Sequence, residues 1–188
     1  MEAFLVSTGV VALGEIGDKT QLLALMLAAR FRKPLPIVLG ILVATVVNHG
    51  LAGALGAVVR DLLGPEVLRW VLGASFIAVG IWALFPDKMD EDEARPRGDW
   101  GVFGVTVVTF FLAEIGDKTQ LATVMLAARF DSLIAVVSGT TLGMLIADVP
   151  AVFVGGLAAP KLPLKWIRIA AAAVFVALGV GVLLGLGR

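Results

Sequence analysis

One sequence pattern occurs twice in this chain, 99 residues apart. The segment 15–31 reads EIGDKTQLLALMLAARF and the segment 114–130 reads EIGDKTQLATVMLAARF, so 14 of the 17 positions are identical. The same shift pairs Gly40 with Gly139 and Phe76 with Phe175. Agreement this close in both halves indicates an internal duplication, so the fold must be built from two copies of one unit.

Each copy contains three long apolar segments. Of the 188 residues, 59% are hydrophobic and only 16% are charged, which is too little polar surface to cover a globular domain in water. A helix that crosses a bilayer needs about 20 mostly apolar residues. Six segments meet this requirement: 4–28, 35–59, 67–85, 102–128, 133–158 and 164–187. We therefore expect an all-α integral membrane protein with six transmembrane helices.

Three spans per copy determine how the copies are oriented. An odd number of crossings makes the second copy enter the membrane from the opposite side, which gives a 3+3 inverted-topology repeat. Residues 1–86 form the first repeat, residues 87–100 an acidic connecting loop, and residues 101–188 the second repeat. Many secondary transporters are built in this way, with the substrate site between the repeats near the bilayer midplane.

Positive charge in the loops indicates which side faces the cytoplasm, because cytoplasmic loops carry an excess of Lys and Arg. If both termini lie outside the cytoplasm, nine such residues fall on the inner side and four on the outer side. The inner residues are Arg30, Arg32, Lys33, Lys88, Arg95, Arg97, Lys161, Lys165 and Arg168, and the outer ones are Arg60, Arg69, Arg129 and Arg188. We expect both termini to lie outside.

Composition excludes several classes of chemistry. The chain has no Cys, so disulfides, Fe–S clusters and thiolate metal sites are ruled out. It has a single His and no G-x-x-x-x-G-K-[ST] loop, so a His-rich metal site and ATP use of that kind are not expected. We expect no enzymatic activity, no resident cofactor and no nucleic-acid partner. The lipid bilayer is the expected environment, and the sequence leaves the oligomeric state open.

Ionisable residues interrupt the first and fourth spans near their middles. Glu15, Asp18 and Lys19 form the first group. The second group consists of Glu114, Asp117 and Lys118. Each ionised group at the centre of a membrane helix costs roughly 2.5–3.5 kcal/mol, so six of them in a repeated arrangement indicate a functional site.

Helical spacing suggests how these residues act. In a continuous helix, Glu15 and Asp18 share a face at i and i+3, and Lys19 at i+4 could pair with Glu15. Gly17 and Gly116 permit either close helix approach or a local break that frees carbonyl oxygens. One alternative is that Glu15–Lys19 and Glu114–Lys118 are ion pairs that only lock the bundle, but this leaves Asp18 and Asp117 unexplained.

Inversion of the repeats is expected to bring the two motifs together. Four carboxylates, from Glu15, Asp18, Glu114 and Asp117, would then face one cavity, and such oxygen-rich sites suit Ca²⁺, Mn²⁺ or Mg²⁺. With two Lys, which balance charge, the cavity would carry a charge of −2, matching one divalent cation or two protons. Protons and metal ions would compete for the same oxygens. The residues Thr20, Gln21, Thr119 and Gln120 are predicted to supply accessory oxygens or to act in gating.

A second polar layer lies in the second and fifth spans. The 99-residue shift places Asp148 opposite His49, and Asn48 adjoins the histidine. We interpret Asn48 and Asp148 as further accessory ligands or gating residues, and His49 as part of a proton path. The alternative is that these side chains only form hydrogen bonds between helices.

The paired motif resembles a known family of small cation transporters. That family, uncharacterised protein family 0016, carries a duplicated E-x-G-D-[KR]-[TS] signature. Glu15-x-Gly17-Asp18-Lys19-Thr20 matches its first copy and Glu114-x-Gly116-Asp117-Lys118-Thr119 its second. The resemblance implies Ca²⁺/Mn²⁺:H⁺ antiport, with manganese export for bacterial members. It also implies a location in the bacterial inner membrane.

These observations together predict a secondary transporter that exports a divalent cation in exchange for protons. Mn²⁺ is the favoured ion and Ca²⁺ the second choice. A passive divalent-cation channel, a non-transporting membrane scaffold and an exporter of an organic cation are the alternatives. A channel could not concentrate the ion against its gradient, and a scaffold would have no affinity for metal.

Overall fold

The computed structural model describes residues 1–86, 100–154 and 164–186, and this part of the chain contains helices and no strand. The first repeat comprises α1 (Glu2–Glu15), α2 (Lys19–Phe31), α3 (Pro34–Leu62) and α4 (Pro65–Trp82). The second comprises α5 (Gly101–Glu114), α6 (Lys118–Arg129), α7 (Leu133–Val154) and α8 (Leu164–Leu183). The predicted all-α class is therefore confirmed.

Four helices are long and apolar enough to cross a membrane: α3, α4, α7 and α8. The predicted span 35–59 lies within α3, and the span 67–85 largely coincides with α4. The last residues of the predicted spans 133–158 and 164–187 lie outside the described residues, as does nearly all of the acidic loop 87–100.

The first and fourth predicted spans are not single helices. Segment 4–28 is divided into α1 and α2, and segment 102–128 into α5 and α6. Each break begins directly after the glutamate of the motif, and its glycine has a positive φ, +83° at Gly17 and +76° at Gly116. A residue in this conformation cannot continue a right-handed helix, so neither predicted span is one continuous helix.

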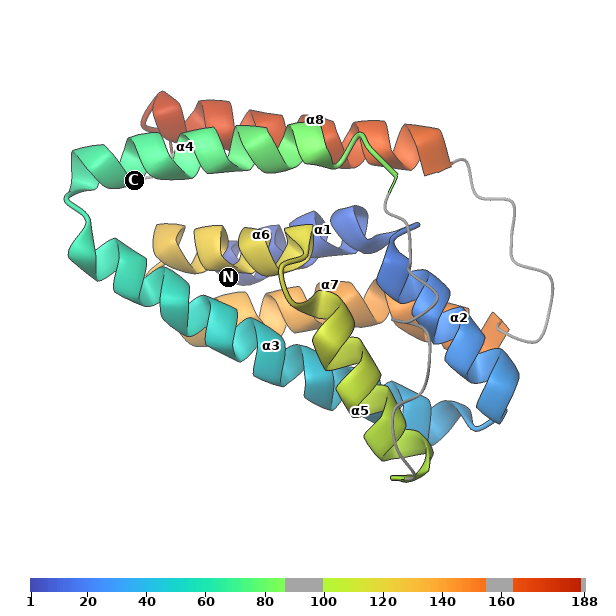
Figure 1. Cartoon of the computed structure of the whole chain (residues 1–188). Helices are drawn as coiled ribbons and strands as arrows, with labels where there is room; N and C mark the ends of the chain where they lie inside the picture. Colours follow the sequence, from blue (N-terminus) through green and yellow to red (C-terminus); the bar gives the residue numbers. More distant parts are fainter. Residues whose placement is uncertain (87–99, 155–163, 187–188) are drawn as a thin grey trace.

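The helices are arranged with the symmetry expected of a duplicated unit. In the centre, α3 packs against α7, while α1 packs along α7 and α5 along α3 (Figure 1). Glycines permit the last two contacts. A Cβ added to Gly139 of α7 would lie 2.5 Å from the backbone oxygen of Phe4 in α1, and one added to the equivalent Gly40 of α3 would lie 2.7 Å from Thr106 in α5.

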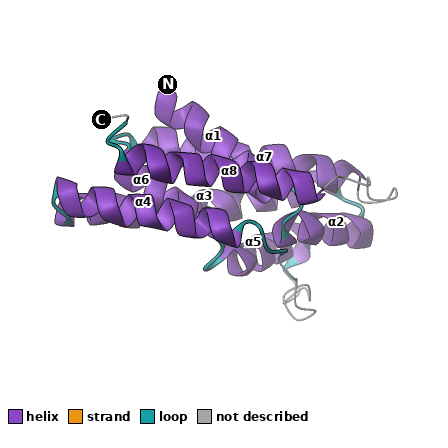
Figure 2. Cartoon of the chain, turned by 90° about the horizontal axis from the view of Figure 1, so that it is seen from above, coloured by secondary structure: helices purple, strands orange, loops and turns teal. Residues whose placement is uncertain are grey.

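The remaining pair, α4 and α8, lie side by side and cover one side of this central group (Figures 1 and 2). Here the symmetry is broken. In the described structure α8 also contacts α1 and α4 contacts α6, whereas the equivalent contacts of α4 with α5 and of α8 with α2 are at most marginal. The α4–α8 pair thus leans towards α1 and α6.

Two apolar cores follow from this arrangement. One contains Phe76 of α4, Phe175 of α8 and Leu126 of α6, all of which are buried. The other joins α2, α3 and α5 around Ile41 and Phe110. The polar residues of the two motifs belong to neither core, so they form a separate buried region.

Candidate metal centre

The two motifs follow the same backbone path. After Glu15 ends α1, Ile16 is extended, Gly17 is left-handed, and Asp18 is the N-cap of α2. Residues 114–117 repeat this between α5 and α6. Helix N-termini attract negative charge, which explains an aspartate at each N-cap. Of the two possibilities for the glycines, the local break is therefore correct.

Each break is closed by the glutamine of its own motif. The backbone N–H of Gly17 donates to Oε1 of Gln21 at 2.9 Å, and that of Gly116 donates to Gln120 at 2.8 Å. The amide groups then reach across to the other repeat. Nε2 of Gln21 donates to the backbone oxygen of Ala147 at 2.8 Å.

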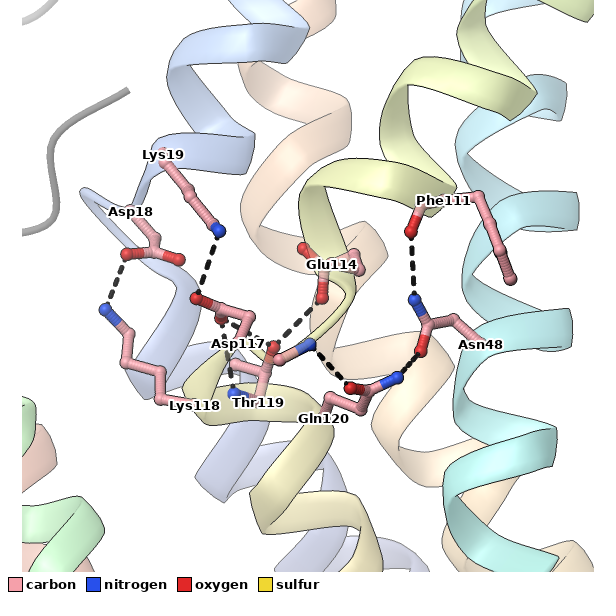
Figure 3. Close-up of polar contacts among 10 residues, drawn as sticks. Asp18, Lys19, Asn48, Phe111, Glu114, Asp117, Lys118, Thr119 and Gln120 are labelled. Atoms are coloured by element: carbon pink, nitrogen blue, oxygen red, sulfur yellow. Dashed lines mark hydrogen bonds and ion pairs between the residues drawn. The ribbon is translucent and has the colours of Figure 1, made fainter. Parts of the chain in front are cut away.

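The second glutamine makes the equivalent contact with a side chain. Nε2 of Gln120 donates to Oδ1 of Asn48, whose own amide donates to the backbone oxygen of Phe111 at 3.3 Å (Figure 3). Sequence reasoning placed Asn48 and both glutamines near the site, but it missed the carbonyl groups of Ala147 and Phe111. The 99-residue shift, which pairs Ala147 with Asn48, was the available signal.

Three carboxylates converge between the breaks. Glu15, Glu114 and Asp117 each offer an oxygen atom, and these atoms lie within 4.8 Å of one another. The side chains are buried, with exposed fractions of 0%, 0% and 2%. Within the described part of the chain, both oxygens of Glu15 and Oε1 of Glu114 lack a hydrogen-bond partner. Buried carboxylate oxygens in this condition are suited to a cation or to protons.

The lysines pair with the aspartates of the opposite repeat. Nζ of Lys118 lies 2.5 Å from Oδ1 of Asp18, and Nζ of Lys19 lies 3.7 Å from Oδ1 of Asp117 (Figure 3). Lys19 could have paired with Glu15 at i+4, but it pairs with Asp117 instead, and the prediction that Glu15 and Asp18 share a helix face is wrong. Both assumed a continuous helix, and the break separates these residues.

The threonines differ between the repeats. The hydroxyl of Thr119 is 3.1 Å from Oε2 of Glu114 and 3.2 Å from Oδ2 of Asp117. The equivalent hydroxyl of Thr20 is buried and has no hydrogen-bond partner among the described residues. The site is thus asymmetric, with the tighter polar network on the second motif.

The residues of the second polar layer are also buried. Asn48, His49 and Asp148 have no exposed surface. In the described structure, neither ring nitrogen of His49 and neither carboxylate oxygen of Asp148 has a hydrogen-bond partner. Asp148 is close enough to Glu15 and Glu114 to interact electrostatically with both. The structure therefore brings Asp148 near the acidic cluster, and its role as an accessory ligand or gating residue stays a prediction.

Acidic side chains buried at two helix breaks, within a bundle of apolar helices, define the chain as a membrane transporter of cations. Comparison with known sequences identifies the group within this class. The chain belongs to the family of the divalent cation/proton antiporter GDT1, whose profile matches residues 3–91 and 102–187. The two matched segments correspond to the two repeats, and the resemblance drawn from the motifs is confirmed.

Individual relatives cover most of the chain. A protein of Vibrio cholerae serotype O1 named "Putative manganese exporter" is 51% identical over 176 residues, which are 93% of this chain and 87% of that protein. "GDT1-like protein 4" of Oryza sativa subsp. indica is 27% identical over 186 residues, 86% of this chain and 66% of the rice protein. "GDT1-like protein 5" of Arabidopsis thaliana is 24% identical over 221 residues, 98% of this chain and 96% of that protein. No solved structure matches the chain.

Proposed function

We propose that this chain is a secondary transporter that exports Mn²⁺ in exchange for protons, with Ca²⁺ as its second substrate. The observation that carries the proposal is the convergence of Glu15, Glu114 and Asp117, buried and within 4.8 Å of one another. Oxygen ligands suit both ions. The name of the Vibrio cholerae relative favours manganese over calcium.

The charges in the site support exchange against protons. The two crossed ion pairs balance Asp18 and Asp117 with Lys118 and Lys19. Glu15 and Glu114 have no such cation within the described residues, so together they require either one divalent ion or two protons. Since the same oxygens serve both, binding of the metal ion displaces protons, which is the coupling that an antiporter needs.

The crossed pairs also suggest how Asp18, the fourth carboxylate, takes part. Asp117 belongs to the convergent cluster, and Lys19, 3.7 Å away, must withdraw from it when a metal ion binds. Asp18 is held by Lys118 at 2.5 Å. The repeats are equivalent, so we propose that the opposite state exchanges the roles: Asp18 joins the ligands and Asp117 is held. Thr20 and Thr119 then alternate as accessory ligands.

His49 and Asp148 are proposed to carry protons between the site and the solvent. Asp148 interacts electrostatically with both glutamates of the site. His49 is at the equivalent position of the other repeat and is fully buried without a hydrogen-bond partner among the described residues. In this proposal both termini lie outside the cytoplasm of a bacterium, the inner membrane holds the protein, and inward proton flow expels Mn²⁺.

The test is transport by the purified protein in liposomes. A pH gradient is imposed, internal pH is followed, and Mn²⁺, Ca²⁺, Mg²⁺ and Zn²⁺ are added separately. We expect Mn²⁺, and more weakly Ca²⁺, to move protons. Glu15→Gln, Asp18→Asn and Asp117→Asn should each abolish this signal. Asp61→Asn is the matched control, because Asp61 is 71% exposed, outside the site, and paired only with Arg60 in the described structure.

Each other outcome would contradict the proposal in a recognisable way. Entry of Mn²⁺ down its own gradient without proton movement would indicate a channel. No response and no metal binding by folded protein would indicate a scaffold. Proton movement only with organic cations would indicate a different substrate. Normal exchange by Asp18→Asn or Asp117→Asn would exclude the four-carboxylate site.

A further inference from the structure

Two arginines line a cavity at the end of the bundle where α4 begins and α6 ends. This cavity of about 160 Å³ lies among α4, α6 and the turn after α8, and its polar side chains are Arg69 and Arg129. Nε of Arg69 and Nη1 of Arg129 are buried and have no hydrogen-bond partner in the described structure. Buried guanidinium N–H groups without acceptors indicate a place for an anion.

The charge around the cavity suits a single negative charge. Nη2 of Arg69 lies 2.5 Å from Oε1 of Glu66, and this is the one carboxylate that forms an ion pair with either arginine among the described residues. Two guanidinium groups and one carboxylate leave one positive charge in excess. The start of α4, whose N-cap Gly64 provides no side-chain hydrogen bond, adds a helix N-terminus that also favours an anion.

An apolar groove continues from this cavity towards the other end of the bundle. The groove has a volume of about 350 Å³, lies between α4 and α6, and shares Leu72 and Ala128 with the arginine-lined cavity. It extends along α4 from Val71 to Trp82. At 1.5 Å per residue this is about 16 Å, close to half of the roughly 30 Å hydrocarbon thickness of a bilayer.

We propose that the cavity and groove together bind one anionic phospholipid of the surrounding bilayer. The phosphodiester group contacts Arg69 and Arg129, and one acyl chain lies in the groove beside Ser75 and Trp82. A free phosphate ion would fill only the cavity, and a lipid without net negative charge would leave the excess positive charge of the cavity unbalanced. The lipid contacts both α4 and α6, so it holds the α4–α8 pair against α6.

Fluorescence of Trp82 provides the test. In a protein carrying Trp70→Phe, Trp100→Phe and Trp166→Phe, Trp82 is the one tryptophan left. Quenching by dibrominated phosphatidylglycerol is compared with quenching by dibrominated phosphatidylcholine of the same chain length. Each arginine near a lipid headgroup contributes about 1 kcal/mol, or about fivefold in affinity. We expect wild-type selectivity for phosphatidylglycerol of about fivefold, lost in Arg69→Gln or Arg129→Gln, because either change removes the one positive charge in excess.

Two variants serve as controls. Arg60→Gln should keep the selectivity, because Arg60 is at the same end but contacts Asp61 and Asp131 instead of the cavity. Ala78→Leu fills the groove and should weaken both lipids equally. Equal quenching by the two lipids in the protein that keeps both arginines would by itself overturn the proposal. So would loss of selectivity in Arg60→Gln, or displacement of the lipid by soluble glycerol phosphate.

Discussion

At Gly116 the helix break requires a left-handed backbone, although packing leaves room for a side chain. The φ of Gly116 is +76°, and a Cβ added there would meet nothing within 4 Å. Replacement by Ala should therefore lower the free energy of unfolding by about 1–2 kcal/mol through backbone strain alone. Asn tolerates the left-handed region better, so Gly116→Asn should cost clearly less.

The measurement is unfolding of the two variants in detergent. Gly9→Ala is the matched control, because Gly9 lies inside α1 with open space around it and no positive φ. It should be neutral or stabilising by about 0.5–1 kcal/mol. Equal destabilisation by Ala and Asn at position 116 would show that the side chain, and not the left-handed conformation, is what the break cannot accept.

The two crossed ion pairs should differ in strength. Lys118 and Asp18 are 5% and 2% exposed, and their charged atoms are 2.5 Å apart. Removing one partner of a buried pair costs about 3–5 kcal/mol, because it leaves the other charge buried. The side chain of Lys19 is 15% exposed and 3.7 Å from Asp117, so its loss should cost less.

Double-mutant cycles measure this difference. We expect the cycle of Lys118→Met with Asp18→Asn to give a coupling energy above 1.5 kcal/mol, and that of Lys19→Met with Asp117→Asn a smaller one, within the range of 0.5–3 kcal/mol found for contacting residues. Equal coupling energies in the two cycles would mean that the asymmetry of the site has no energetic consequence.

At the scale of helices, the duplicated pattern identified carboxylates that the structure brings together, but it did not predict how the charged residues pair. The 99-residue shift paired Glu15 with Glu114 and His49 with Asp148, and all four side chains are buried in the structure. The partner of Lys19 could not be predicted. Spacing along one helix favours Glu15, whereas the left-handed Gly17 ends that helix and leaves the choice to contacts between the repeats.

The one-sided position of the α4–α8 pair predicts a movement. The repeats are equivalent, so the state open to the other side of the membrane should exchange their contacts, with α4 leaving α6 and α8 leaving α1. Ser75 of α4 and Val124 of α6 line the same groove. A short thiol cross-linker between Ser75→Cys and Val124→Cys should therefore stop Mn²⁺–proton exchange, and cleavage of the linker should restore it.

A cross-link inside the moving pair provides the control for this experiment. A Cβ at Gly73 of α4 would lie 2.4 Å from the side chain of Leu183 of α8. In the double variant Gly73→Cys, Leu183→Cys, the shorter side chain at position 183 makes room for the new one, and the two Cys join the helices. The chain has no other Cys. Exchange should continue in this variant. Undiminished exchange with α4 linked to α6 would show that these helices stay together during transport.

At the scale of the whole molecule, the sequence predicted the long apolar helices better than the path of the chain through the membrane. The long apolar helices α3, α4, α7 and α8 were expected as spans and are suited to that role. Each segment that carries a motif consists of two short helices. Sequence periodicity does not reveal the path that the two helices take together. Figure 1 shows α1 beginning and α8 ending at the same end of the bundle.

The balance of charge in the site predicts the stoichiometry of exchange. Glu15 and Glu114 are the carboxylates of the convergent cluster without a paired lysine in the described structure, so one Mn²⁺ should replace two protons and no net charge should cross the membrane. Each pH unit is worth 1.36 kcal/mol per proton. Two protons should therefore support about 100-fold accumulation of Mn²⁺ per pH unit. Membrane potential should have no effect.

Steady-state Mn²⁺ in liposomes checks this, with the pH gradient set by buffers and the potential set independently by potassium and valinomycin. Exchange of one Mn²⁺ for one proton would move a net charge, and 100 mV would then change the accumulation about 50-fold, since one charge across that potential is worth about 2.3 kcal/mol. Liposomes containing Glu114→Gln give the background. A dependence on potential of that size would mean that only one of the two glutamates exchanges its proton. Lys19 and Lys118 would then have to balance the remaining charge of the site.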